Sequence, residues 1–215
     1  MRRAVTGFAM PDTKWFVAKR PAPAASSCLY SEARRTAMIP IPQPSLALNT
    51  SEFGPEYHYT MQASETVTRY ARVEFIVESV LRHAGEQGGR LEALVINAHG
   101  MAGPDGVALG VGLHLGNAHL WGPAHGLVGR IWLCACQVAD TPAGRDFCQA
   151  LAAATGAEVV GTVEPQVATY RDLEPAFEMF PLRLARIPPD CVDEFEGPIF
   201  LWSPDGVMHP FDPHG

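Results

Sequence analysis

Three short apolar runs restrict the fold of this chain more than any other feature. They occupy residues 91–98, 130–135 and 157–163, and each is bounded by glycine or polar residues. Short runs without polar alternation are typical of strands that are buried on both faces of a parallel sheet. Helical patterns separate them along the chain. This alternation of strand and helix predicts an α/β fold with a mainly parallel sheet.

Two segments carry the helical patterns. Within residues 62–89 the apolar residues recur near the helical spacing, with Ser64 as the expected N-cap and a cluster of glycines at the end. The second segment runs from Thr141 to Gly156. Thr141 is its expected N-cap, Pro142 suits the first helical position, and Gly156 suits the position after the last turn.

The stretches around these segments predict shorter elements. Residues 107–116 alternate glycine with apolar residues and favour a small hairpin, while residues 117–128 favour a weak helix. Residues 197–211 predict two strands joined by the turn sequence "SPDG" at 203–206.

The first 55 residues differ from the rest in composition. The stretches "RPAPAASS" and "MIPIPQPS" are rich in proline, alanine and serine, which favour extended conformations over regular ladders. We therefore expect residues 20–55 to form a linker or a surface strap, preceded by a strand at 14–18. The predicted domains are an extended segment at residues 1–55 and an α/β domain at residues 56–215.

The net charge limits the kinds of partner that we expect, and the cysteines and the first residues limit the cellular compartment. The formal net charge is −7, which disfavours nucleic acid and anionic membranes as the main partners. No apolar stretch approaches the ~20 residues of a membrane-spanning helix, and the basic start lacks the apolar core of a signal peptide. The five cysteines are odd in number and unevenly spaced, which predicts reduced thiols. We expect a cytoplasmic protein, or one exported by a route without a signal peptide.

Two of the apolar runs end in residues suited to nucleophilic chemistry. The run "LVINAHG" ends at His99 and Gly100, and "IWLCACQV" ends with Cys134 and Cys136. Because the carboxyl ends of parallel strands share one edge of a sheet, His99 and a cysteine are expected at the same edge. There an imidazole can activate a thiol, and backbone N–H groups can stabilise an oxyanion.

The two cysteines have different expected roles. Cys134 and Cys136 are two residues apart, so on a strand their side chains point to the same face. Cys136 lies nearer the sheet edge and is the better candidate nucleophile. Cys134 lies deeper and is expected to pack as a small apolar residue.

In this order the motifs resemble those of the clan CD cysteine peptidases, the group of caspases, gingipains and legumains. Residues 94–163 are most similar to a caspase-like bacterial domain of large surface proteins. That domain has a His-Gly turn, a Gly/Leu-rich hairpin, a "Cys-Asn-Val-Ala" step, an "Ala-Gly…Phe…Leu" helix and a "Thr-Gly-Ala" step. The corresponding stretches here are "AHG", "LGVGLHLG", "CQVAD" and "AGRDFCQALAAATGAEV".

The resemblance implies a fold and a set of residue roles. The fold would be a caspase-like three-layer sandwich, with a mostly parallel sheet and helices on both faces. His99 would act as general base and acid, and Cys136 as the nucleophile. The backbone N–H groups of Gly100 and Cys136 would form the oxyanion hole, and no carboxylate is needed as a third member.

These roles predict a cysteine endopeptidase that acts through an acyl-enzyme intermediate on a protein or peptide substrate. Such an enzyme needs no cofactor, and a bacterial effector or a self-processing protease would fit. The alternative is a non-catalytic binding or structural module that keeps the caspase-like scaffold. The sequence leaves the oligomeric state open.

Other functions for the same residue types have weaker support in the sequence. Cysteines and histidines near the sheet edge are candidate zinc ligands, but Cys-x-Cys is not the usual Cys-x₂₋₄-Cys knuckle, and no metal site is predicted. These candidates are Cys134, Cys136, His99, His114, His119 and His125. Three acids after the third apolar run are candidates for lining a specificity pocket or for a solvated loop, namely Glu164, Asp172 and Glu174. Of the remaining cysteines, Cys148 is expected in the core, and no role is assigned to Cys28 or Cys191.

Overall fold

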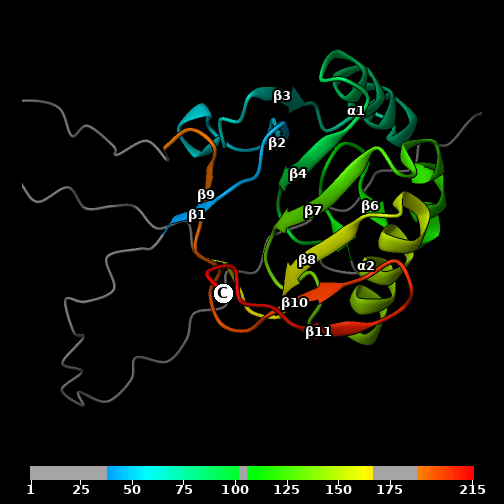
Figure 1. The fold of residues 1–215 in the computed structure, drawn as a ribbon. Coiled ribbons are helices and arrows are strands. Elements are labelled where there is room, and N and C mark those ends of the chain that lie inside the picture. Colours follow the sequence, from blue (N-terminus) through cyan, green and yellow to red (C-terminus); the bar gives the residue numbers. More distant parts are fainter. Residues whose placement is uncertain (1–37, 102–105, 167–187) are drawn as a thin grey trace, which may run out of the picture. The chain divides into compact units, whose positions relative to one another are not determined.

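A seven-stranded, mostly parallel sheet forms the centre of the protein (Figure 1). The computed structural model describes residues 38–101, 106–166 and 188–215. The order of the strands is β11-β10-β8-β7-β4-β2-β3. The neighbouring strands from β3 to β8 are parallel, whereas β10 and β11 are antiparallel. In chain order they are β2 (Ser45–Thr50), β3 (Ala63–Val67), β4 (Leu91–Asn97), β7 (Val128–Cys134), β8 (Glu158–Thr162), β10 (Ile199–Trp202) and β11 (Met208–Pro210).

The elements predicted from the middle and the end of the sequence are confirmed. The three apolar runs form the central strands β4, β7 and β8, and the C-terminal stretch forms the pair β10 and β11. Helix α2 (Pro142–Thr155) begins where the sequence predicts, because the Thr141 side chain accepts a hydrogen bond from the Gly144 N–H at 3.0 Å. Gly156 ends it with a φ of 66°, which suits a residue without a Cβ.

The glycine-rich stretch forms two small elements near the predicted positions. Strands β5 (Gly106–Val107) and β6 (Leu113–His114) pair antiparallel as a short hairpin. The 3₁₀ helix η2 (Leu115–Ala124) follows in place of the weak helix.

The first predicted helix is shorter than the sequence suggested. Helix α1 spans Val73–Glu86, while residues 63–67 form the parallel edge strand β3. Ser64 is therefore not an N-cap; it lies in β3 and its hydroxyl accepts a hydrogen bond from the Met61 N–H at 2.9 Å. The burial of "ASETV" alternates between half-buried and exposed positions up to the buried Val67, and this period of two is that of a strand.

The predicted boundary between residues 55 and 56 lies inside the compact unit, which begins at Thr36. All six residues of β2 are buried, and β2 pairs with both β3 and β4. The prolines that suggested a strap end at Pro44, so every residue of β2 has an N–H for the ladders. At the start of this proline-rich stretch, β1 (Met38–Pro40) pairs antiparallel with β9 (Cys191–Asp193). The strand predicted at 14–18 lies outside the described residues.

The described α-helices cover one face of the sheet, which differs from the predicted arrangement with helices on both faces (Figure 1). The other face is covered by β1, β9 and the β2–β3 connection, which holds one turn of 3₁₀ helix, η1 (Pro55–Tyr57). After β3 the chain crosses the sheet in one direction only, to β4, β7 and β8. Because crossovers between parallel strands are almost always right-handed, connections that run in the same direction lie on the same face.

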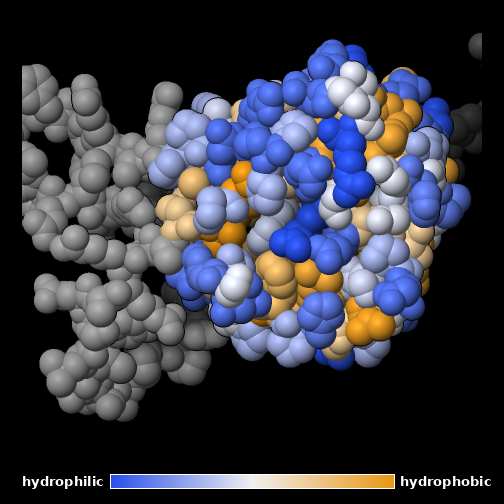
Figure 2. Space-filling model, in the orientation of Figure 1, coloured by the Kyte–Doolittle hydropathy of each residue, from blue (hydrophilic) through white to orange (hydrophobic). Residues whose placement is uncertain are grey.

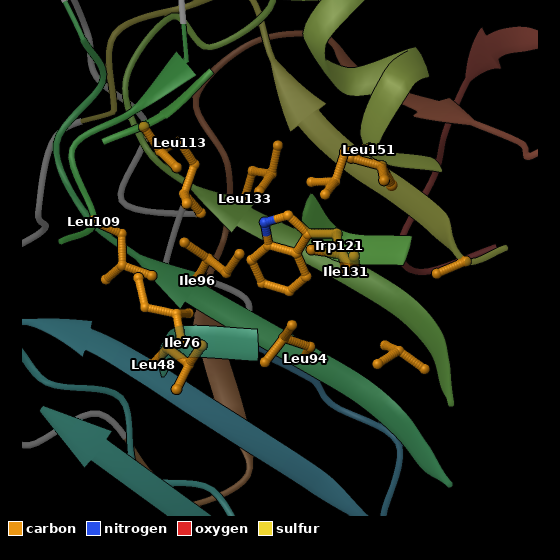
Figure 3. Packing of buried hydrophobic residues seen from close by; sticks show 14 of the residues in the cluster. Leu48, Ile76, Leu94, Ile96, Leu109, Leu113, Trp121, Ile131, Leu133 and Leu151 are labelled. Carbon is orange, nitrogen blue, oxygen red and sulfur yellow. The ribbon is translucent and has the colours of Figure 1, made fainter. Parts of the chain in front are cut away.

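Trp121 of η2 is fully buried at the centre of the helical face. Figure 3 shows its ring among side chains of β4, β7 and α2, including Leu94, Ile131 and Leu151. The surface in Figure 2 is mostly hydrophilic with small apolar groups. Among the described residues, no helix is both long and apolar enough to cross a bilayer.

Candidate active site

The segments that follow β4 and β7 are in contact at the carboxyl edge of the sheet. In the ladder between these neighbouring strands, Asn97 lies opposite Cys134, and His99 and Cys136 each follow two residues later. A Cβ built on Gly100 would lie 1.9 Å from the carbonyl oxygen of Cys136. Only a residue without a side chain fits at this distance. The structure therefore brings together the two segments that carry the predicted site residues.

The segment after His99 is held by backbone pairing with the β5 hairpin. The carbonyl oxygen of His99 accepts a hydrogen bond from the Ala108 N–H at 2.7 Å, and the Met101 N–H donates to the carbonyl of Gly106 at 3.0 Å. Gly100 and Val107 form a β-bridge between these two bonds. The His99 side chain is exposed, and its ring packs edge-to-face on Phe53 with the ring centroids 4.4 Å apart.

Two buried asparagines fix the loop that carries Phe53. The Asn49 side chain donates to the carbonyl of Tyr59 at 3.0 Å and accepts from the Tyr59 N–H at 2.9 Å. The Asn97 side chain donates to Asn49 Oδ1 and to the carbonyl of Tyr57, both at 2.8 Å. These bonds tie residues 57–59 to the ends of β2 and β4, next to the site.

The sequence analysis did not identify these asparagines as site residues. The signal was present, because "LALNT" and "LVIN" each carry an asparagine at or next to the end of an apolar run. A buried amide at a strand end must find hydrogen-bond partners, and a nearby loop backbone supplies them.

Cys136 is half-buried, and its thiol contacts the backbone of Gln166. The Sγ atom donates to the carbonyl oxygen of Gln166 at 3.2 Å and accepts from the Gln166 N–H at 3.3 Å. Gln137, the next residue, has a φ of 51°, which is uncommon for a residue with a Cβ. Its N–H donates to the carbonyl of Glu164 at 3.0 Å, so the loop after β7 is held by the loop after β8.

The backbone N–H groups of Gly100 and Cys136 make no hydrogen bond to any residue that the structure describes. Their flanking N–H groups are bonded: Met101 to Gly106, Ala135 to Leu133 and Gln137 to Glu164. The two N–H groups predicted for an oxyanion hole are therefore not used by the described backbone.

Cys134 is half-buried as a residue, like Cys136, but its thiol is desolvated by the atoms packed around it. Burial raises its pKa, the nearby negative charge of Asp193 raises it further, and a hydrogen bond with Tyr59 lowers it in part. The thiolate of Cys134 is thus strongly disfavoured at neutral pH, and Cys134 is a poor nucleophile. Cys148 is fully buried in α2, as predicted, and burial raises its pKa as well.

The other candidate residues have structural contacts or are not described. His114 caps η2, because its Nδ1 atom accepts from the Gly116 N–H at 3.2 Å. In residues 38–101, 106–166 and 188–215, no three His, Cys, Asp or Glu side chains are grouped so that they could hold a metal ion. Glu164 is exposed beside the site, whereas Asp172, Glu174 and Cys28 lie outside the described residues.

We compared the chain with protein-family models, curated proteins and solved structures, and found no match in any of the three.

Proposed function

We propose that this protein is a cysteine endopeptidase with a caspase-like arrangement, in which Cys136 is the nucleophile and His99 the general base and acid. The main support is the contact between Gly100 and the carbonyl of Cys136. This contact places the His-Gly turn after β4 against the cysteine after β7. The order of motifs along the chain, which resembles that of clan CD peptidases, is the second support.

The proposed reaction has two steps. The imidazole of His99 takes the proton of the Cys136 thiol, and the thiolate attacks the carbonyl carbon of a peptide bond. The backbone N–H groups of Gly100 and Cys136 stabilise the negative oxygen of the tetrahedral intermediate. His99 then gives its proton to the leaving amine, and a thioester remains on Cys136. Water, deprotonated by His99, hydrolyses the thioester and restores the thiol.

The difference between the two cysteines supports Cys136 as the nucleophile. The pKa of Cys134 is raised by burial, so little thiolate forms there at neutral pH. Both cysteines are half-buried, but Cys136 lies beyond the end of β7, in the segment that contacts Gly100.

A non-catalytic module with the same scaffold is the second candidate, and one observation favours it. The Cys136 thiol is hydrogen-bonded to the backbone of Gln166, so its proton points toward a carbonyl oxygen in this conformation. On this view the thiol is a structural contact, and the protein or peptide partner would be bound without being cleaved.

An electrophilic peptide probe tests the proposal. We expect an acyloxymethyl ketone to label the wild type and Cys134→Ala, but not Cys136→Ala. We expect His99→Ala to lower the labelling rate by about 10²-fold or more, the usual range for a general base. Cys191→Ala, which removes another half-buried thiol, serves as the matched control and should label as the wild type does. Labelling that is lost only in Cys134→Ala, or that is unaffected by His99→Ala, would contradict the proposal.

A further inference from the structure

The Cys136 thiol is contacted by both backbone polar groups of one residue. Gln166 presents its N–H to the sulfur at 3.3 Å and accepts the thiol proton on its carbonyl oxygen at 3.2 Å. These two residues are 30 positions apart in the chain. The thiol thus meets one backbone donor and one backbone acceptor of the same residue. The Gln166 backbone also occupies space beside the sulfur.

The Gln166 side chain anchors this backbone to two other segments. Its Nε2 atom donates to Thr162 Oγ1 at 3.3 Å, to the carbonyl of Glu164 at 3.2 Å and to the carbonyl of Glu196 at 3.3 Å. Its Oε1 atom accepts from the Glu196 N–H at 3.0 Å. The side chain thus joins the end of β8 to the loop before β10, and its own backbone stays at the thiol.

We infer that Gln166 is a reversible cap on the Cys136 thiol, and that an extended peptide substrate replaces it. This inference rests on the proposed function, since it takes Cys136 as the nucleophile. The cap offers one backbone donor and one backbone acceptor, which an extended peptide also carries. When the cap is displaced, the thiol proton is free to pass to His99. The Gln166 side chain therefore sets the fraction of molecules in which the thiol can react, and so regulates the site.

The expected increase in the reaction rate of the Cys136 thiol follows from the hydrogen bonds that hold the cap in place. If the capped state predominates, the observed rate at the thiol is the rate in the open state multiplied by the open fraction. Gln166→Ala removes the side-chain hydrogen bonds of an accessible loop, in which the two Nε2 hydrogens are shared among three acceptors and Oε1 accepts one bond. A net loss of the size of one or two such bonds raises the open fraction about five- to thirty-fold.

The test is the rate of alkylation of Cys136 by iodoacetamide at pH 7.5, followed by peptide mapping so that each of the five cysteines is read separately. We expect Gln166→Ala to react about five- to thirty-fold faster at Cys136 than the wild type. The matched control is Gln149→Ala, which removes a glutamine hydrogen bond to the carbonyl of Ser203, away from the thiol. It should leave the rate at Cys136 unchanged. An unchanged rate in Gln166→Ala, or an equal increase in Gln149→Ala, would overturn the inference.

A second variant covers the case in which Gln166→Ala unfolds. Gln166→Glu keeps an oxygen for the Glu196 N–H but loses the Nε2 donor group and its contacts with three acceptors, and it should also react faster than the wild type. Thermal melting identifies an unfolded variant. Peptide mapping does so as well, because unfolding exposes Cys148 and Cys136 to the reagent together. A folded Gln166→Glu protein with the wild-type rate would count against the cap.

His99→Ala, measured in the same assay, separates the two proposals. If Gln166→Ala is fast and His99→Ala is slow, both proposals are supported. If only His99→Ala changes the rate, the cap is wrong and the proposed dyad stands. If Gln166→Ala is fast but His99→Ala has no effect, the cap stands and the proposed peptidase mechanism fails.

Discussion

Gly100→Ala is the substitution that tests the geometry of the proposed site most directly. The new Cβ would lie 1.9 Å from the carbonyl oxygen of Cys136 and 3.0 Å from its carbonyl carbon. The obstacle is backbone, so no side chain can rotate away. To reach an ordinary contact distance, the two segments must separate by about 1 Å or more, at a cost of about 1–3 kcal/mol typical of overpacking.

In the proposed site, the same displacement would also shift His99 and the Gly100 N–H relative to the sulfur. A misplacement of about 1 Å can lower a catalysed rate by about 10²-fold. We therefore expect the labelling rate with the acyloxymethyl ketone probe to fall by about that factor. The free energy of unfolding, measured with urea, should fall by only about 1–3 kcal/mol, so the protein stays folded in the assay.

Gly85→Ala is the matched control. Gly85 lies within α1, and a Cβ built there meets no atom within 4 Å. Alanine at this helical position should stabilise the protein by about 0.5–1 kcal/mol and leave the labelling rate unchanged. If Gly100→Ala labelled at the wild-type rate, the two segments would not need their close contact for chemistry, and the argument for the site would be refuted.

Three further substitutions test other parts of the structure by urea unfolding. Asn49→Ala should cost about 2–3 kcal/mol, because the buried N–H and carbonyl of Tyr59 lose their partner; a cost below 0.5 kcal/mol would contradict this role. Thr141→Ala should cost about 1 kcal/mol through loss of the N-cap bond of α2, whereas Thr141→Ser should cost little. For Glu65, burial acts to raise the pKa, but hydrogen bonds from Ser79, Arg82 and His83 outweigh it and lower the pKa to about 2. The stabilising effect of the Glu65 carboxylate is full above pH ~4.5 and is lost as the pH falls toward 2. Glu65→Gln should therefore lower the free energy of unfolding by about 1 kcal/mol at pH 7, after discounting for solvent, and by less at pH 3. An equal cost at both pH values would contradict this.

The central strands could be predicted because their signal is local. Each apolar run is long enough to be one buried strand, and glycine or polar residues and helical patterns separate it from the next run. The shared edge of the segments after β4 and β7 followed from one general rule, that parallel strands share their carboxyl edge. Their contact also requires that β4 and β7 are neighbours, as the structure shows. The N-cap at Thr141 was equally local, since the residue that caps the helix adjoins it.

The incorrect predictions depended on competing or non-local signals. Strand β2 was hidden by the prolines before it, although "SLALNT" itself contains none. Ser64 was read as a cap because the helical pattern of α1 was extended backward into β3. The placement of both α-helices on one face depends on the order of strands in the sheet, and no single segment of the sequence encodes that order.

Gln166 shows why the contacts of the site are harder to predict than its position. Nothing in "EPQV" sets this glutamine apart in the sequence. Its importance arises because β8 lies next to β7, which puts the loop after β8 beside the loop that carries Cys136. A contact of this kind requires the strand order, the register and the course of both loops.

The backbone N–H groups of Gly100 and Cys136 have no hydrogen-bond partner among residues 38–101, 106–166 and 188–215, and this bears on the proposed catalytic role. Both residues are half-buried, and an unpaired N–H that is shielded from water costs about 1–3 kcal/mol. The flanking N–H groups of Met101 and Gln137 donate to backbone carbonyls, so the same loops do pair other backbone groups. In loops with a purely structural role, pairing these two groups within the described part of the chain would add stability. In a peptidase the same groups are left for the oxygen of a substrate, where the hydrogen bonds strengthen as negative charge develops.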